Sequence, residues 1–134
     1  MKFGPFTLSD QIGEGGFATV YKATGPGSGP VALKVLKDKF LDNKRVRRDF
    51  VKEATIQKQL THENIARCYG LVRDGRRMAI CMEFIEGGTF RSRAHGPEAF
   101  EQDLPILLQI AMGLGYLHSN GIVHLDLKPG NVLV

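Results

Sequence analysis

Residues 12–20 read IGEGGFATV and join two stretches of strand-like composition. Residues 6–12 alternate between apolar and polar side chains, and residues 17–23 continue in the same style. This pattern predicts a β-hairpin with a glycine-rich tip. Because Gly13 and Gly15 carry no side chain, the backbone of the tip can approach a phosphate group closely. A tight turn without a ligand explains the same glycines, so the tip alone leaves both interpretations open.

The residues that follow predict a sheet with one helix against it. Residues 25–30 contain only glycine, proline and serine and form a loop, after which residues 31–36 give a third strand. The hydrophobic period changes to 3.6 over residues 43–60, with Asp42 or Asn43 available as the N-cap. A second hairpin is expected over residues 65–72 and 78–85. The sequence thus predicts five antiparallel strands and a helix.

The last third of the chain is expected to be mainly helical. Residues 89–102 show no fixed period and fit either a loop or a short helix. From Asp103, expected to cap the helix, to Asn120 a stripe of leucines predicts a strong helix, with Pro105 in its first turn. Residues 124–131 form a polar loop, and residues 132–134 begin another strand.

Composition bounds the class of protein. The chain has 134 residues, 43% of them hydrophobic, and a net charge of +4. Its apolar runs are far shorter than the ~20 residues of a membrane span, and its first residues lack the apolar core of a secretory signal. Cys68 and Cys81 lie in apolar stretches outside any zinc-binding spacing and are expected to be reduced core residues. We therefore expect a single cytoplasmic domain without a membrane partner.

Basic residues cluster between positions 37 and 48 and could in principle bind nucleic acid, but the surrounding sequence does not favour this interpretation. Three aspartates are interleaved with the cluster, and no run of stacking aromatic residues accompanies it. A solvated helix face explains the cluster, and no nucleic-acid partner is expected. Its members are Lys37, Lys39, Lys44, Arg45, Arg47 and Arg48.

Two opposite charges are predicted on faces that otherwise pack. Lys34 lies in the strand VALKVL on the same face as Ala32 and Leu36, so it needs an anionic partner or a route to solvent. Glu53 follows Val46 by seven residues on the packed face of the helix. We expect the two to form an ion pair, or to do so once the helix swings in. That pair is either an internal salt bridge or a device that orients Lys34 toward a phosphate.

The polar loop HLDLKPGN, residues 124–131, favours the second interpretation. Asp126 can accept a hydroxyl proton, Lys128 can contact a phosphoryl oxygen, and the amide of Asn131 can hold Mg²⁺. These are the groups that phosphoryl transfer needs. A solvated loop is the alternative.

Together these motifs resemble the eukaryotic protein kinases over nearly the whole chain. The family's GxGxxGxV appears as residues 13–20, with Ala18 at the third glycine, and VAIK appears as residues 31–34. Glu53 resembles the glutamate of the family's helix C, and HRDLKxxN appears as residues 124–131. The lysine two residues after Asp126 resembles the serine/threonine kinases.

The resemblance implies a fold and a function. The fold would be α+β, with residues 6–85 as small lobe and hinge and residues 86–134 as the start of a large lobe, so that residues 1–134 form a partial kinase domain. The activity would be transfer of the ATP γ-phosphoryl to a serine or threonine hydroxyl of a protein, with Mg²⁺ as cofactor. Asp126 would be the base, Lys128 would contact the γ-phosphate, and Asn131 would hold the metal ion.

The resemblance also implies the nucleotide contacts. Met82 would be the gatekeeper, and the backbone of residues 83–85 would meet adenine. Val20 and Ala32 would cover the adenine from one side and Leu133 from the other. The implied contacts are Ile12, Gly13, Glu14, Gly15, Gly16, Phe17, Ala18, Thr19, Val20, Ala32, Lys34, Glu53, Met82, Glu83, Ile85 and Leu133.

Three departures from the family pattern bear on activity. Leu125 replaces the arginine that pairs with a phosphorylated activation loop, and Gln57 stands where an apolar side chain usually packs beneath the helix. The 134 residues contain no DFG motif, so only Asn131 of the two metal-holding side chains is present, and we expect them to be inactive alone. Other classes are a non-catalytic nucleotide-binding or docking remnant and a small-molecule phosphotransferase with an HxDxxxxN loop. VALK and DLKPGN favour the protein kinase.

Overall fold

The computed structural model describes residues 1–27, 29–90, 100–123 and 131–134. These residues form two compact units. The first unit contains residues 1–61 and 66–84, and the second contains residues 62–65 and 85–134. Each unit is described by itself below.

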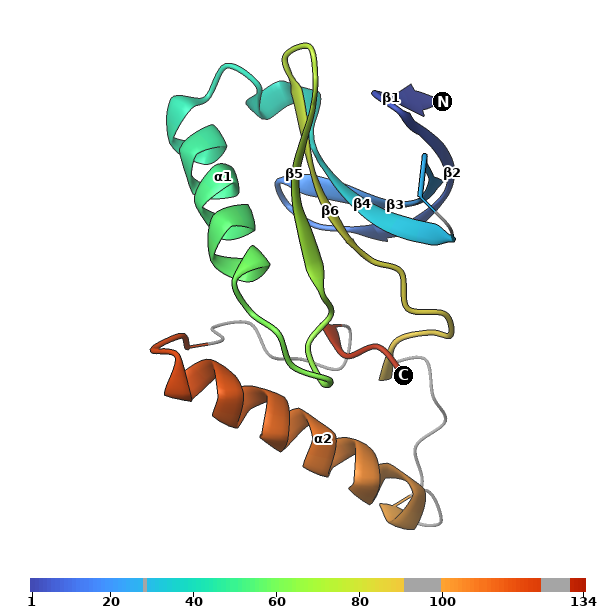
Figure 1. Cartoon of the computed structure of the whole chain (residues 1–134), viewed down its shortest axis with the longest axis vertical. Helices are drawn as coiled ribbons and strands as arrows, with labels where there is room; N and C mark the ends of the chain where they lie inside the picture. Colours follow the sequence, from blue (N-terminus) through green and yellow to red (C-terminus); the bar gives the residue numbers. More distant parts are fainter. Residues whose placement is uncertain (28, 91–99, 124–130) are drawn as a thin grey trace. The chain divides into compact units, whose positions relative to one another are not determined.

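The first unit is built on an antiparallel sheet of six strands, in the order β1-β2-β3-β4-β6-β5 (Figure 1). The sequence predicted five strands; the sixth, β1, has only two residues, too few for any alternation to be visible. Its Phe3 is fully buried and pairs with Phe6. The strands are β1 (Lys2–Phe3), β2 (Phe6–Glu14), β3 (Ala18–Thr24), β4 (Pro30–Leu36), β5 (Cys68–Asp74) and β6 (Arg77–Glu83).

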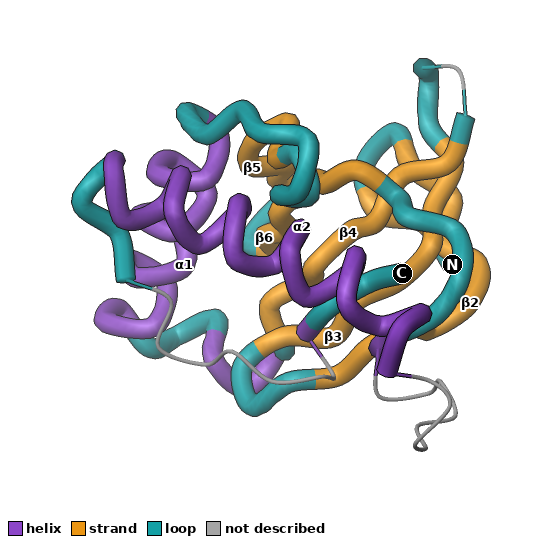
Figure 2. Tube along the Cα trace, turned by 90° about the horizontal axis from the view of Figure 1, so that it is seen from below, coloured by secondary structure: helices purple, strands orange, loops and turns teal. Residues whose placement is uncertain are grey.

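The helix predicted after the third strand is α1 (Lys44–Lys58), which follows a short 3₁₀ turn, η1 (Asp38–Phe40). Of the two candidate caps, Asn43 is the one used, because its side chain accepts a hydrogen bond of 3.1 Å from the N–H of Val46. The helix buries Phe50 and Ala54 and packs against β5, the strand at one edge of the sheet, whose other edge is β1 (Figures 1 and 2).

The sheet separates two hydrophobic cores, as the period-2 alternation of its strands requires. On the face that α1 covers, Phe50 and Ala54 pack with residues of β4, β5 and β6, among them Leu36 and Ile80. On the opposite face a second cluster forms around Phe3. The buried members of this second cluster are Phe3, Leu8, Ala23, Leu33, Ala79 and Cys81.

The second unit contains α2 (Phe100–Ser119). We expected Asp103 to cap this helix and Pro105 to lie in its first turn. The helix instead begins three residues earlier, because Glu101 and Gln102 are good helix formers, so Asp103 is not its cap and Pro105 lies inside it. The helix ends as predicted near Gly121, whose φ is +73°, and the N–H of Ile122 closes the last turn on Leu117 at 2.9 Å.

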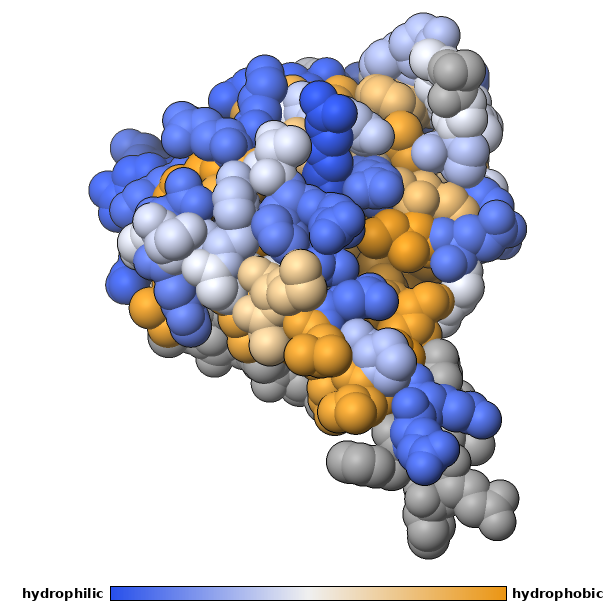
Figure 3. Space-filling model, turned by 60° about the horizontal axis from the view of Figure 1, so that its bottom comes forward, coloured by the Kyte–Doolittle hydropathy of each residue, from blue (hydrophilic) through white to orange (hydrophobic). Residues whose placement is uncertain are grey.

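One side of α2 leaves apolar side chains exposed (Figure 3). Leu108 is 59% exposed and Met112 is 52% exposed, and Leu104 and Leu107 are also largely in solvent. Within the described part of the chain, no helix is long and apolar enough to cross a membrane.

The strand expected at residues 132–134 is reduced to a short pairing with residues 88–90. Leu133 forms a single antiparallel bridge with Thr89, and the N–H of Phe90 donates to Val132 at 2.7 Å. Gly87 precedes this pairing with a φ of +120°, and a Cβ there would lie 2.2 Å from the carbonyl oxygen of Val134. Only glycine fits this position.

Candidate nucleotide-binding site

The glycine-rich stretch is the tip of the β2–β3 hairpin. Gly13 pairs with Val20 and Glu14 with Thr19, and the N–H of Gly15 donates to the carbonyl of Ala18 at 2.8 Å. A Cβ added at Gly16 would meet nothing within 4 Å. The backbone of the tip is therefore accessible to a ligand.

The strand register gathers four of the predicted contacts on one face of the sheet. Val20 lies opposite Lys34 across β3 and β4, and Ala32 lies opposite Met82 across β4 and β6. Because directly opposite residues point to the same side and Ala32 and Lys34 are two apart, all four share a face. Met82 packs against the core of the face that α1 covers, so this is also the face of α1.

Lys34 and Glu53 meet on that face. Nζ of Lys34 donates to Oε1 of Glu53 at 2.6 Å, which confirms the predicted ion pair. The two side chains keep 32% and 35% of their surface exposed. The pair is thus held by the sheet and by α1, yet remains open enough for an anionic ligand to reach the ammonium group.

Gln57 joins this pair. Its Nε2 donates to Oε1 of Glu53 at 3.3 Å, one helical turn further along α1. In place of the apolar side chain usual in the family, the protein therefore has a polar contact to the carboxylate.

The thiol of Cys68 lies close to the same place, with Sγ 3.8 Å from the carbonyl oxygen of Ala54. Burial raises the pKa of Cys68, and the nearby Glu53 raises it further. Burial also raises the pKa of Cys81. Both thiols are buried and free, in agreement with the prediction that they are reduced core residues.

At the end of β6, Glu83 is engaged twice with Arg67. Its N–H donates to the carbonyl of Arg67 at 2.8 Å, and its Oε2 accepts from the N–H of Arg67 at 3.0 Å. The N–H of Glu83 is consequently committed and cannot serve as an adenine contact. Next to it, the ammonium of Lys22 lies 4.7 Å from the ring centre of Phe84, which fixes the start of the connection to the second unit.

Ile12 lies in β2 of the first unit and is 46% exposed. The other remaining predicted residues belong to the second unit or lie outside the described residues. Ile85 is half-buried, Leu133 is 48% exposed, and Asn131 is exposed at the start of the 131–134 segment. Asp126 and Lys128, the expected catalytic residues, lie outside the described residues. Within the described residues, no group of three His, Cys, Asp or Glu side chains is placed to hold a metal ion.

Comparison with known proteins places the chain in a family. Residues 6–134 match the protein kinase domain. The chain belongs to the protein kinase family. It corresponds to the amino-terminal part of the kinase domain, and the curled antiparallel sheet with α1 is the small lobe of that fold.

The relatives of this kinase chain include serine/threonine kinases. A probable serine/threonine-protein kinase of Clostridium acetobutylicum is 35% identical, with 96% of this chain and 20% of the relative covered. The Aurora kinase of Saccharomyces cerevisiae is 33% identical, with 96% and 36% covered. The crystal structure of the Mycobacterium tuberculosis PknI kinase domain superposes with a TM-score of 0.76 at 26% identity, with 99% and 56% covered. The chain thus spans about a fifth to a third of these curated relatives.

Two groups of contacts around the candidate site were not predicted from the sequence. The bond from Gln57 to Glu53 was missed because Gln57 stood out only as a departure from the family pattern, although its i,i+4 spacing from a glutamate was a usable signal. The contacts of the glycine-rich tip with residues 37–40 carry no sequence signal, because they depend on where β4 ends.

Proposed function

We propose that this chain is the nucleotide-binding part of an ATP-dependent protein kinase that phosphorylates serine or threonine hydroxyls. The observation that carries the proposal is the ion pair between Lys34 and Glu53, 2.6 Å apart, on the sheet face that also bears Val20 and Ala32. A lysine held by a carboxylate beside a glycine-rich hairpin is the arrangement that binds the phosphates of ATP in protein kinases.

In this proposal the first unit holds the phosphates. The ammonium of Lys34 contacts the α- and β-phosphates while Glu53 fixes its direction, so that little reorganisation is needed when the transferring group gains charge. The open backbone of Gly15 and Gly16 approaches the phosphates from the hairpin tip.

The adenine contacts are also proposed. Val20, Ala32 and Met82 give an apolar surface on the sheet face. With its N–H bonded to Arg67, Glu83 can contribute only its carbonyl, which leaves the donor to Ile85. Leu133, which forms a bridge with Thr89, is proposed as a further apolar adenine contact from the family resemblance alone.

In this proposal, residues 124–131 provide the groups that carry out phosphoryl transfer. Asp126 accepts the proton of the substrate hydroxyl, and Lys128 neutralises a γ-phosphoryl oxygen. The amide oxygen of Asn131 is a hard donor of the kind that Mg²⁺ accepts, and the phosphates would complete the coordination. The metal ion, when bound, supplies positive charge to the β- and γ-phosphates. The 134 residues alone carry only this one of the family's two metal-holding side chains, so they are proposed to be inactive by themselves.

The test compares the chain alone with the same chain continued in frame through a large lobe that carries DFG and APE. ATP binding and phosphorylation of a generic serine/threonine substrate such as casein are measured for both. Lys34→Met is expected to cut transfer by a hundredfold or more, roughly the loss of one preorganised charge. Asp126→Asn, the matched variant, should abolish transfer while ATP binding persists.

Two results would change the proposal. ATP binding without transfer in the extended protein would favour the non-catalytic nucleotide-binding remnant, and unchanged transfer by Lys34→Met would remove the phosphate-binding role assigned to Lys34. The free thiols Cys68 and Cys81 support a cytoplasmic location, where thiols stay reduced.

A further inference from the structure

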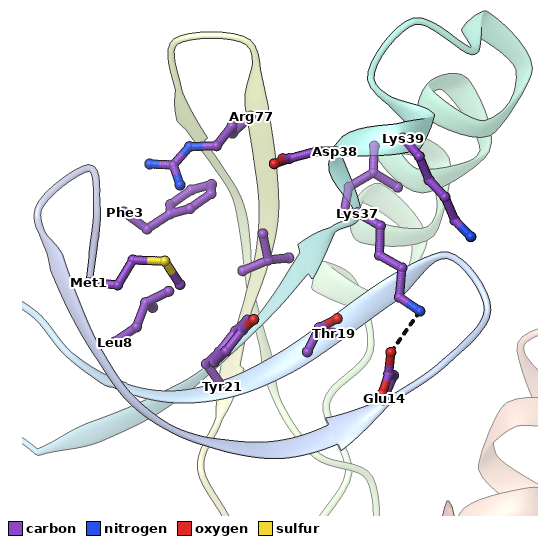
Figure 4. Close-up of a pocket in the computed structure, with 12 residues that line it drawn as sticks. Met1, Phe3, Leu8, Glu14, Thr19, Tyr21, Lys37, Asp38, Lys39 and Arg77 are labelled. Carbon is purple, nitrogen blue, oxygen red and sulfur yellow. Dashed lines mark hydrogen bonds and ion pairs between the residues drawn. The ribbon is translucent and has the colours of Figure 1, made fainter.

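The tip of the glycine-rich hairpin is attached to the segment that connects β4 to α1. Nζ of Lys37 donates to Oε1 of Glu14 at 2.9 Å, and the two side chains point toward each other (Figure 4). The ring of Phe17 lies 5.0 Å from the ring of Phe40 between centroids. The N–H of Lys37 also donates to the carbonyl of Phe17 at 2.9 Å. Three contacts of different kinds therefore join the tip to residues 37–40.

The Lys37–Glu14 ion pair reaches the tip from the side opposite to Lys34, whereas Phe40 packs against the core on the face that α1 covers. Lys37 directly follows the last residue of β4, three positions after Lys34, and its side chain lies on the other face of the sheet. There Lys37 and Glu14 border a cavity of about 500 Å³ that is also lined by Phe3, Leu8 and Tyr21 (Figure 4). The tip is therefore held by an ion pair on the face away from Lys34 and by a ring contact with Phe40, which packs on the α1 face.

The segment that receives the tip is itself well held. Phe40 and Leu41 pack against the core beneath α1. The carbonyl of Phe40 accepts from the N–H of Asn43 at 3.0 Å, and the carbonyl of Leu41 accepts from Arg47 at 3.1 Å. Since Asn43 caps α1, hydrogen bonds join residues 40–43 to the first turn of the helix.

The tip, in contrast, gains little from burial. Phe17 is 57% exposed, and Gly15 and Gly16 have solvent-exposed backbone. Consecutive glycines have many accessible conformations, and fixing them costs conformational entropy. Contacts with residues outside the hairpin therefore decide how often the tip occupies one position. The hydrogen bond from the ammonium of Lys37 also holds the pKa of Glu14 below its usual value.

We propose that Lys37 and Phe40 are positioning residues that hold the glycine-rich loop for the phosphates of ATP, through Glu14 and Phe17. Neither touches the nucleotide; both act through the loop. Because residues 40–43 lead directly into α1, the loop and the helix that carries Glu53 share one support. The inference rests on the proposed function and deepens it, since it assigns to the β4–α1 connection the control of ATP affinity.

The first test uses a fluorescent ATP analogue and the 134-residue chain. Phe17→Leu and Phe40→Leu keep an apolar side chain but remove the ring contact, so each should raise the dissociation constant roughly three- to tenfold. If the two rings act through each other, the double variant should lose no more than either single one. Additive losses would show that the rings act separately and would overturn the inference.

The second test exchanges the charges. Lys37→Glu alone and Glu14→Lys alone place like charges together and should weaken binding roughly two- to fivefold, within the range of an exposed ion pair. The double exchange should restore most of the affinity. Lys44→Glu, which changes the net charge equally at an exposed position of α1, is the matched control and should leave binding unchanged. Failure of the double exchange to restore binding would overturn the role of Lys37.

A readout that needs no nucleotide separates this inference from the proposed function. In chains labelled with 4-fluorophenylalanine, the ¹⁹F resonance of Phe17 should shift in Phe40→Leu, because a neighbouring ring is lost. A shifted resonance with unchanged ATP affinity would overturn the inference alone. Absence of ATP binding in the unmodified chain would overturn both.

Discussion

Gln57 donates its side-chain amide to Oε1 of Glu53 at 3.3 Å, the same oxygen that accepts from Lys34 at 2.6 Å. One carboxylate oxygen thus has a neutral donor and a charged donor, which its two lone pairs allow. Because Gln57 lies one turn after Glu53 on α1, it restrains the side chain of Glu53 from within the helix.

The first prediction concerns this restraint. Gln57→Glu replaces the donor by a second carboxylate and should weaken ATP binding about fivefold, which corresponds to ~1 kcal/mol, the net value of a typical hydrogen bond. Gln57→Met keeps the volume without adding charge and should have a smaller effect. Isothermal titration calorimetry at constant pH measures both. Equal affinities of Gln57→Glu and the unmodified chain would show that the bond does not position Glu53.

The second prediction concerns acid stability. The guanidinium of Arg77 and the N–H of Gly4 hold the pKa of Asp74 below its ordinary value of 3.8. The same arginine lies over the ring of Phe3 at 4.8 Å and donates to the carbonyl of Lys2 at 3.1 Å, so the pair anchors β1.

Because the folded pKa of Asp74 is the lower one, the unfolded chain binds more protons in this pH range. The stabilisation that the charged carboxylate of Asp74 provides is therefore complete above about pH 4, and it is lost as the pH falls through the pKa of Asp74 in the folded chain. Asp74→Asn should be less stable than the unmodified chain at pH 7, and the difference should shrink below about pH 4. Urea unfolding between pH 3 and pH 7 measures it; a difference independent of pH would contradict the assignment.

The third prediction concerns Gly87. Alanine there would combine a φ of +120° with a Cβ 2.2 Å from the carbonyl oxygen of Val134, so the pairing of residues 88–90 with residues 132–134 should open. The expected cost is about 1–3 kcal/mol. Faster hydrogen exchange at the N–H groups of Phe90 and Val134 would report it. Gly27→Ala, where a Cβ meets nothing within 4 Å, is the control and should leave both rates unchanged.

The fourth prediction concerns the exposed side of α2. Leu104, Leu108 and Met112 lie four residues apart and are each about half exposed, so they form an apolar row. The 134-residue chain should therefore self-associate at high concentration. Changing all three to glutamine should lower its apparent mass in light scattering while α-helical circular dichroism is retained. Identical association of both chains would show that another surface is responsible.

The sequence predicted those features that follow from local pattern. The alternation around Val20 and Lys34, the period of α1 and the inward position of Glu53 all follow from residues close in the chain, and the ion pair followed from two such placements. The two-residue β1 was missed because it has no pattern of its own and is held by Arg77, which lies 74 residues away from Phe3.

The site was predictable to the same extent. The residue types of Lys34 and Glu53 were enough to predict both as site residues. The hydrogen-bond donors around them depend on the strand register and on the orientation of α1, and the hydrophobic pattern of the sequence does not determine either. The start of α2 was misplaced because Asp103 is a good cap by type, while the helix-forming residues before it extend the helix.

The two hydrophobic cores lie on opposite faces of the sheet, so residues that matter for stability can be changed apart from residues on the ligand side. Substitutions around Phe3, Leu33 and Ala79 act on the face away from Lys34, so they can change the melting temperature with little effect on the ligand side. Such positions are natural choices for raising expression yield or for compensating a destabilising change elsewhere. Directed evolution of the face that carries Lys34 can therefore use stability gained from substitutions on the opposite face, while changes at the glycine-rich tip must respect its contacts with Lys37 and Phe40.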